Sequence, residues 1–189
     1  MDNSQFSTLL TQHAEQLAEA CRRTIPIQIG HLASDMFKDN FRRAGYQGNG
    51  FTPWAITRRQ QSGGTDAGSQ RTPLLSANNH LMSSIQYVPS DFSVVISNPV
   101  PYAAIHNEGG TIPMTPAMRA HWWKEYYAHG GHVKGSTTPE KPESKKYKAL
   151  ALTKHNIRIP KRQFMGDSPE LQALISQRIK STITDILNK

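Results

Sequence analysis

The chain has 189 residues, of which 37% are hydrophobic, and its mean hydropathy is −0.58. This length can hold one ordinary domain with a core, or one domain and an appendage. No apolar run approaches the roughly 20 residues of a membrane span, and the N-terminus lacks a signal-peptide pattern. Cys21 is the only cysteine, which excludes an internal disulfide framework and indicates a reducing compartment. We expect Cys21 to be a buried structural thiol, because it falls on the apolar stripe of a predicted helix.

The net charge of +8 is concentrated in one region. Residues 116–165 contain eleven Lys or Arg and three acidic residues, a surplus equal to that of the whole chain. Such a region can contact DNA phosphates or an acidic protein surface, and a solvated flexible arm is the alternative without a binding role. The lysines of the candidate basic arm are Lys141, Lys145, Lys146 and Lys148.

The N-terminal part is predicted to form two helices followed by a long loop. Apolar residues at helical spacing indicate an amphipathic helix over residues 4–23. Pro26 is expected to end that pattern and to begin a second helix that stops near Ala44. We expect the two helices to form an antiparallel pair or to pack together on a sheet. Residues 45–72 are rich in Gly, Gln, Ser and Thr and are predicted to be a mobile loop.

A strand pattern then leads into a corner bounded by prolines. Residues 84–88 and 92–97 are predicted to form a β-hairpin, with Phe92 and every second residue after it on one buried face. Two prolines end the second strand because proline has no backbone donor and restricts the residue before it. Residues 102–107 can then form one or two helical turns, ended by a pair of glycines.

The second half of the chain is predicted to contain two further helices around a disorder-like tract. Residues 115–129 begin with a cap and a proline and read as a helix. Its aromatic residues are candidates for a partner contact or for packing on their own domain; they are Trp122, Trp123, Tyr126 and Tyr127. Residues 130–148 have a disorder-like composition, residues 157–159 alternate as a strand does, and residues 168–186 keep helical spacing.

No set of residues indicates catalysis or metal binding. The triplet His106-Asn107-Glu108 resembles the His-x-Glu of zinc deaminases, but the Pro-Cys-x-x-Cys that completes such a site is absent from the sequence. The sequence also lacks a Gly-x-Ser-x-Gly elbow and a phosphate-binding loop. We therefore predict no catalytic residue, no metal ligand, no cofactor and no enzyme activity. We expect His106 and Glu108 to make hydrogen bonds within the fold or across a subunit contact.

Three segments follow one another in a specific order between residues 74 and 170. They are Leu81-Met82-Ser83-Ser84-Ile85, residues 101–110 (PYAAIHNEGG) and residues 159–166 (IPKRQFMG), and residues 112–119 (IPMTPAMR) lie between the last two. In this order and spacing they resemble the phage virion-morphogenesis family, whose members are tail-completion or head–tail joining proteins similar to the G protein of phage Mu.

The resemblance implies a structural virion assembly protein that completes the tail or joins it to the head at the neck. It implies a homo-oligomeric ring that meets other phage head, neck or tail proteins. From the location of the positive charge alone we expect a non-specific contact with packaged DNA, and the lack of a long apolar run indicates no membrane partner. The expected location is the virion, and the host cytoplasm during assembly. The alternative function is a free-standing DNA-binding protein that uses residues 116–165.

The expected fold is α+β in a single domain over residues 1–189. A small antiparallel sheet is expected to carry the two N-terminal helices, the aromatic middle helix and the C-terminal helix, with long mobile loops at 45–72 and 130–148. We predict that Tyr102, His106 and Glu108 lie at or beside a subunit or partner surface.

Two residues of the last family segment are predicted to be structural anchors. Arg162 and Phe164 are expected to hold the last strand in place. Arg162 is also a candidate ion-pair partner of Glu108.

Overall fold

The computed structural model describes residues 2–188 except 62, 133–134, 136–138 and 154–155. The chain divides into two compact units, which we describe separately. Unit 1 contains Met1–Glu108 and Lys161–Lys189, and unit 2 contains Gly109–Pro160.

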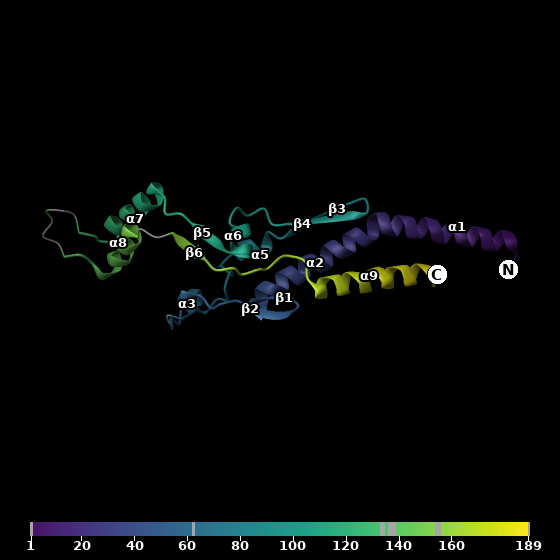
Figure 1. The fold of residues 1–189 in the computed structure, drawn as a ribbon, viewed down its shortest axis with the longest axis horizontal. Coiled ribbons are helices and arrows are strands. Elements are labelled where there is room, and N and C mark those ends of the chain that lie inside the picture. The colour runs from purple at the N-terminus through teal and green to yellow at the C-terminus, as the bar shows by residue number, and fades with distance from the viewer. Residues whose placement is uncertain (1, 62, 133–134, 136–138, 154–155, 189) are drawn as a thin grey trace. The chain divides into compact units, whose positions relative to one another are not determined.

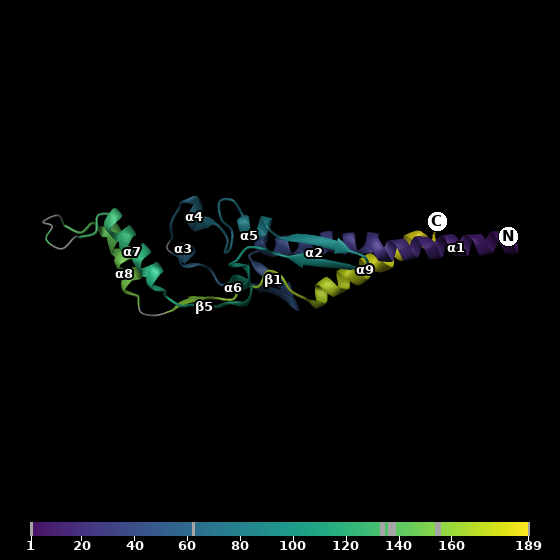
Figure 2. The same cartoon turned by 90° about the horizontal axis from the view of Figure 1, so that it is seen from above.

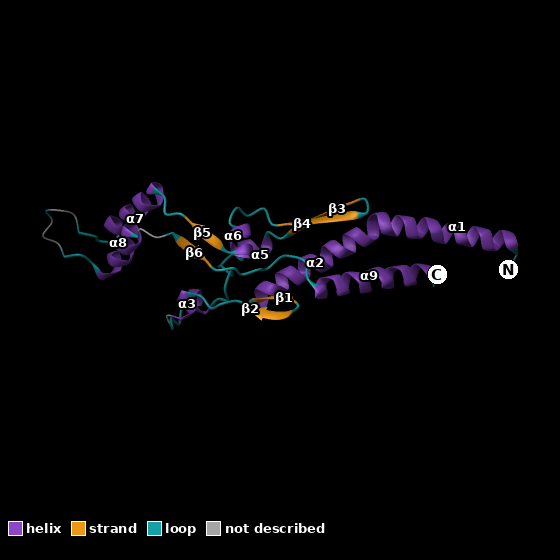
Figure 3. Ribbon diagram, viewed as in Figure 1, coloured by secondary structure: helices purple, strands orange, loops and turns teal. Residues whose placement is uncertain are grey.

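Helices and strands alternate irregularly along the chain (Figure 3). Unit 1 contains α1 (Asn3–Glu19), the π-helical turn η1 (Ala20–Thr24), α2 (Ile25–Arg42), β1 (Gly45–Gly48), β2 (Gly50–Pro53), α3 (Arg58–Gln61), α4 (Ala67–Gln70), α5 (His80–Ser83), β3 (Gln86–Ser90), β4 (Ser93–Ser97), α6 (Ala103–Glu108) and α9 (Pro169–Leu187). Unit 2 contains β5 (Gly110–Ile112), α7 (Pro116–Ala128), the 3-10 turn η2 (Pro142–Ser144), α8 (Lys145–Leu152) and β6 (Ile157–Ile159).

The helices α1, η1 and α2 form one uninterrupted helical segment, so the predicted break at Pro26 is wrong (Figure 1). Proline has no N–H, and in a regular α-helix its ring collides with the carbonyl four residues earlier. Here a widened π-turn precedes Pro26. The Arg22 carbonyl, which Pro26 leaves without a helical donor, accepts a hydrogen bond from the Phe92 N–H (2.9 Å). The Arg22 guanidinium also pairs with Asp91 (2.7 Å), so the β3–β4 turn supports the helix at this point.

The helix that packs beside α2 is α9, so the expected antiparallel pairing of the first two helices is wrong (Figure 2). The start of α9 is fixed by Ser168, whose Oγ accepts a hydrogen bond from the Leu171 N–H (3.1 Å), as the cap-and-proline pattern predicts. Further along, the Thr182 hydroxyl donates to Gln28 Oε1 near the start of α2 (2.8 Å). At the other end, the Tyr46 hydroxyl just after α2 donates to the Asp167 carbonyl before α9 (3.0 Å), so α9 runs antiparallel to α2.

The predicted hairpin is present as β3 and β4, and it lies along α2. Tyr87 and Ile96 are directly paired and are the more buried residues of their strands, whereas the paired Val88 and Val95 are exposed. Tyr87 approaches α2 so closely that a Cβ on Gly30 would lie 2.3 Å from its ring. This close approach requires glycine in the helix, although glycine weakens a helix interior.

Phe92 does not lie on the buried face, contrary to our expectation. It occupies the two-residue turn between β3 and β4, with φ 60° and 69% of its surface exposed. The side-chain alternation therefore begins with Ser93 and not with Phe92. A non-glycine residue in the left-handed region is strained.

Residues 45–72 contain more regular structure than the predicted loop. β1 and β2 form an antiparallel hairpin at its start, and α3 and α4 are single helical turns further on. Trp54 follows β2, is buried, and donates from Nε1 to the Gln163 carbonyl (2.9 Å). Composition pointed to a loop here because four-residue strands and single helical turns leave almost no periodic signal.

The core of unit 1 gathers residues from α2, from the segment after β2 and from the segment before α9. The Phe41 ring lies 4.9 Å from the Phe164 ring and 5.6 Å from the Trp54 ring, measured between centroids. Phe41 and Phe164 are 0% and 1% exposed. The other members of the buried cluster are Ala33, Phe37, Leu81, Ile85, Val100, Ala103 and Leu171.

Unit 2 consists of the antiparallel pair β5–β6 and the packed helices α7 and α8. The predicted disorder-like tract 130–148 is therefore partly helical, since η2 and the start of α8 fall within it. The predicted α+β fold class is confirmed. In the described residues, however, the strands form three separate two-stranded antiparallel sheets in place of one small sheet.

Candidate partner-recognition site

The corner after β4 is shaped by hydrogen bonds from Asn98. Its Nδ2 donates to the Leu81 carbonyl (2.7 Å), and its Oδ1 accepts from the Val100 N–H (3.1 Å). The second bond is an Asx turn, which replaces the ladder bonds that the flanking prolines cannot make. The Ala103 N–H then donates to the Val100 carbonyl (2.9 Å) and starts α6.

The corner is joined to the segment 161–165 by one main-chain hydrogen bond and by two that the Asn107 side chain accepts. The Arg162 N–H donates to the His106 carbonyl (2.8 Å). Asn107 Oδ1 accepts from the N–H groups of both Phe164 and Met165, each at 2.9 Å. The Phe164 carbonyl accepts from Asn40 Nδ2 on α2 (3.1 Å). Two sequence motifs that lie more than fifty residues apart are thus held together in unit 1.

A pocket of about 460 Å³ lies beside this corner. Its wall contains Tyr102 and His106 of the corner, whose rings meet edge to face at 5.9 Å. Arginines supply the charge, and no carboxylate is among the described residues that line it. The remaining lining residues are Thr57, Arg58, Arg59, Leu74, Leu75, Ser76, Leu81 and Arg162.

Backbone carbonyls hold two of these arginines in position. The Arg162 guanidinium donates to the Ala55 carbonyl from Nε (3.3 Å) and from Nη2 (3.0 Å). Arg59 Nη2 donates to the carbonyls of Thr72 (3.0 Å) and Leu75 (3.1 Å). Carbonyl groups orient a guanidinium without neutralising its charge, so Arg162 contributes a positive potential to the pocket.

The pKa values of two pocket residues, His106 and Arg162, are lowered by their surroundings. Burial lowers the pKa of His106 below its ordinary value, and the charge of Arg162 lowers it further. Burial also lowers the pKa of the Arg162 guanidinium, with Arg59 as the second cause. His106 Nδ1 is buried and has no hydrogen-bond partner in the described part of the chain. An anionic or hydrogen-bonding group from outside would therefore be stabilised in this pocket.

The residues predicted at the partner surface do not all lie in the pocket. Tyr102 is 44% exposed and lines it, and His106 is half-buried there. Glu108 is exposed at the end of α6. The predicted Arg162–Glu108 pair is wrong, because the buried Arg162 side chain is directed to the Ala55 carbonyl and no ion pair joins the two described residues. Phe164 is buried in the core, the position that an anchor requires.

The aromatic residues of α7 pack mainly within unit 2. Tyr126 is only 2% exposed, so it offers no surface for a partner. Trp122 is stacked on Tyr147 of α8, with centroids 6.4 Å apart, and Trp123 contacts Tyr126 edge to face at 5.4 Å. Tyr127 alone among the four is half exposed. Most of this aromatic cluster therefore packs within unit 2, which is one of the two alternatives that the sequence left open.

The candidate basic arm is built into the structure of unit 2. Lys145, Lys146 and Lys148 belong to α8, and Lys148 Nζ lies 3.5 Å from a Glu140 carboxylate oxygen. Lys146 and Lys148 also lie over tyrosine rings, at 4.8 and 5.6 Å from the centroids. The Lys141 N–H donates to the Gly130 carbonyl (3.1 Å). The described lysines of this tract are therefore carried on ordered backbone.

Two further features concern chemistry at other places in the chain. No group of three or more His, Cys, Asp or Glu side chains in the described residues is placed to hold a metal ion. Cys21 is exposed, so the expectation of a buried thiol is wrong. It lies in the π-turn η1, where the helix face rotates away from the register that the sequence pattern assumes.

The sequence profile of the phage virion morphogenesis family matches residues 1–184. The chain belongs to this family. Its function is accordingly a structural role in virion assembly, and it is associated with the virion. No curated protein and no solved structure matches the chain, so the likeness to the G protein of phage Mu stays a prediction. No helix in the described residues is both long enough and apolar enough to cross a membrane.

In this virion morphogenesis protein, hydrogen bonds at the corner join three segments of unit 1 that carry the resemblance to the family. They contain Leu81, Asn107 and Phe164. Asn40 and Asn107 connect them, although neither residue was predicted to have a role of its own. Asn40 could have been found, because it is a polar residue on the apolar stripe of α2 and is 1% exposed. Arg58 and Arg59 of the pocket carry no sequence signal, since they come from a stretch that was predicted to be a loop, whereas Arg162 was predicted as a structural anchor.

Proposed function

We propose that this family member completes the tail or joins it to the head at the neck. It does so by binding neighbouring copies and other head, neck or tail proteins, and it performs no chemical reaction. It assembles in the host cytoplasm and remains in the virion. The observation that carries the proposal is the arginine-lined pocket beside Tyr102 and His106, on a corner held by buried hydrogen bonds.

The chemistry of the pocket favours an acidic segment of a neighbouring virion protein. The described lining of the pocket contains Arg58 and Arg162 and no residue with a negative charge. A partner carboxylate would supply that charge and could accept a hydrogen bond from His106. Tyr102 adds an exposed aromatic side chain, the residue type that is enriched in binding hot spots.

Charge reversal at the pocket rim tests this proposal. A phage lacking the protein is complemented with the wild type, Arg58→Glu or Tyr102→Ala, and plaques and particles are counted. Loss of about 1.4 kcal/mol weakens partner binding about tenfold, so we expect each variant to reduce the number of plaques and to leave unjoined heads and tails visible by electron microscopy. Lys180→Glu is the matched control, because Lys180 is exposed on α9 and outside the pocket. Full complementation by both pocket variants would contradict the proposal.

DNA contact is a second candidate function, favoured by the charge of unit 2. Residues 109–160 contain nine Lys or Arg and three Glu, a net charge of +6. If this unit binds packaged DNA, affinity for duplex DNA falls steeply with salt, and each lysine lost from the contact lowers the slope by about one. The test is to measure DNA binding after neutralising Lys141, Lys145, Lys146 and Lys148. Absence of binding to duplex DNA at low salt would remove this candidate.

A further inference from the structure

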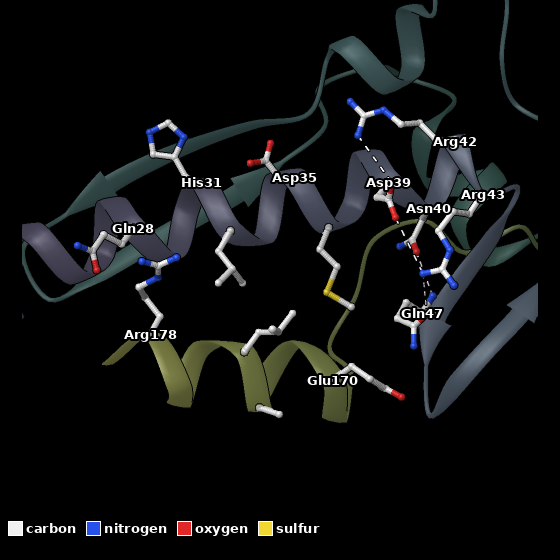
Figure 4. A pocket seen from close by; sticks show the side chains of 14 residues that line it. Gln28, His31, Asp35, Asp39, Asn40, Arg42, Arg43, Gln47, Glu170 and Arg178 are labelled. Atoms are coloured by element: carbon white, nitrogen blue, oxygen red, sulfur yellow. Dashed lines mark hydrogen bonds and ion pairs between the residues drawn. The ribbon is translucent and has the colours of Figure 1, made fainter. Parts of the chain in front are cut away.

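A groove runs between α2 and α9 of unit 1, with a volume of about 1220 Å³ (Figure 4). Its apolar lining comes from Leu32 and Met36 on α2 and from Ala173 and Leu174 on α9. Leu174 is 42% exposed. Apolar side chains are thus exposed along the junction of two antiparallel helices. Such a groove can bind a third, amphipathic helix.

The helix α1 is amphipathic, and none of its residues is buried. Its apolar stripe begins with Phe6, Leu9 and Leu10, and the exposed fractions of Phe6 and Leu10 are 50% and 53%. In both views the first turns of α1 extend past the end of α9 (Figures 1 and 2). An apolar stripe of this kind normally lies against another element.

The lengths of the helix and the groove agree. The 17 residues of α1 span about 25 Å at 1.5 Å per residue. The lining residues on α2 extend from Gln28 to Arg43, which is about 22 Å on the same scale. Figure 4 places Gln28 and Arg178 at one end of the groove and Arg43, Gln47 and Glu170 at the other.

The charges do not oppose α1 as the occupant. Its sequence contains acidic residues and no Lys or Arg, and the groove is lined by three arginines and three carboxylates. Asp39 pairs with both Arg42 and Arg43, so the lining presents no net charge that would exclude α1. Asp39 lies 3.9 Å from Arg42, and Glu170 accepts a hydrogen bond from the Gly50 N–H (2.6 Å).

The α1 of the same chain cannot fill this groove. Because α1, η1 and α2 are one uninterrupted helical segment, α1 continues in line with α2 and cannot fold back into the α2–α9 groove, although it contacts the last part of α9. We infer that α1 of a second copy of this chain binds in the α2–α9 groove, with Phe6, Leu9 and Leu10 against Leu32, Met36 and Leu174. The donor helix and the acceptor groove are different surfaces, so each copy can bind two neighbours, as a ring requires. This inference rests on the proposed assembly function and names the surface that joins the copies.

Cysteine crosslinking of purified full-length protein tests the inference. In a Cys21→Ser background, a Leu10→Cys chain is mixed with a differently tagged Leu174→Cys chain and oxidised. We expect a disulfide between the two chains. Thr8→Cys is the matched control, because Thr8 lies on the opposite side of α1, and we expect it to form no crosslink with Leu174→Cys. Crosslinking of Leu10→Cys to itself, without the mixed product, would show pairing between α1 helices and would overturn the inference.

Light scattering provides the second measurement. The wild type is expected to form a concentration-dependent oligomer, and Leu10→Asp and Leu174→Asp are each expected to reduce its mass to that of one chain. Circular dichroism checks that both variants remain folded. A wild type that stays a single chain at all concentrations, or an oligomer unaffected by Leu10→Asp, would overturn the inference. These measurements need no virion, so their failure is distinct from failure of the complementation that tests the assembly function.

Discussion

The two halves of the helical segment from Asn3 to Arg42 carry similar apolar stripes but have different surroundings. α2 buries eight of its residues, whereas α1 buries none. The hairpin β3–β4, the strand β1 and the helix α9 all return to α2, and of these α9 also contacts α1. The comparison teaches that an apolar stripe predicts a contact without saying whether the contact lies within the chain. We therefore expect changes in α2 to affect the fold and changes in α1 to affect assembly.

The largest expected effect is on the core that α2 shares with Phe164. Phe164→Ala removes a ring that is 1% exposed and packs on Phe41, and we expect it to lower the free energy of unfolding by about 3–5 kcal/mol. Phe6→Ala makes the same change on α1, where the ring is 50% exposed, and should change stability by less than about 0.5 kcal/mol. Urea denaturation measures both. Equal losses would mean that α1 is packed within its own chain, and the comparison would fail.

The buried polar side chain of Asn40 on α2 tests the same difference between α2 and α1. Its Nδ2 donates to the Phe164 carbonyl, and its Oδ1 accepts from the Gln47 N–H (3.0 Å). Asn40→Ala leaves both backbone groups without this partner in a buried site, so we expect a loss of about 2–3 kcal/mol. The Gln47 amide should also exchange faster with solvent. Gln12→Ala on α1 is the control and should leave stability unchanged. An unchanged stability in Asn40→Ala would show that the α2 contacts are not what holds the core.

At the junction of the two halves of the helical segment, relief of backbone strain at Phe92 should increase stability. Phe92 has φ 60° and is 69% exposed, and the left-handed conformation costs a non-glycine residue about 1–2 kcal/mol. Phe92→Gly removes that strain but frees the unfolded chain, so the expected net gain is about 0.5–1 kcal/mol. Phe92→Asn is a second variant, since asparagine tolerates this conformation. The melting temperature measures both. A loss in both variants would show that the Phe92 ring, and not its backbone, supports η1.

A smaller effect is expected on the pH dependence of stability, through His106 in the corner of unit 1. Burial and Arg162 lower the pKa of His106 from its ordinary 6.5 in the folded chain. The unfolded chain then binds more protons between the folded pKa and 6.5, so the stability due to neutral His106 is complete above 6.5 and is lost as pH falls toward the folded pKa. We expect His106→Gln to flatten the fall in melting temperature below pH 6.5. Identical profiles for wild type and His106→Gln would contradict this.

The sequence predicted those elements whose signal is local and periodic. The β3–β4 hairpin, the α9 cap at Ser168 and the presence of helices on both sides of Pro26 all follow from residues close to one another. The continuity of the helix through Pro26 could not be predicted, because it depends on the Phe92 N–H, which lies 66 residues further on. The recognition pocket was partly predicted through Tyr102 and His106. Arg58 and Arg59 were not, since they lie on a single helical turn that has no sequence pattern, and Arg162 was predicted only as a structural anchor.

The smallest expected effect is the most informative for α1. Leu10→Ser exposes no core, because Leu10 is 53% exposed, and in dilute solution it should change the free energy of unfolding by less than about 0.5 kcal/mol. Leu171→Ser on α9 is the matched control at a residue only 6% exposed, where we expect a loss of about 2 kcal/mol or more. If α1 binds a second copy, the wild type gains stability as protein concentration rises, because association favours the folded state. Leu10→Ser should remove that dependence while leaving the dilute value intact. A loss that is the same at every concentration would instead place Leu10 against its own chain, and α1 would then belong to the fold in the same way as α2.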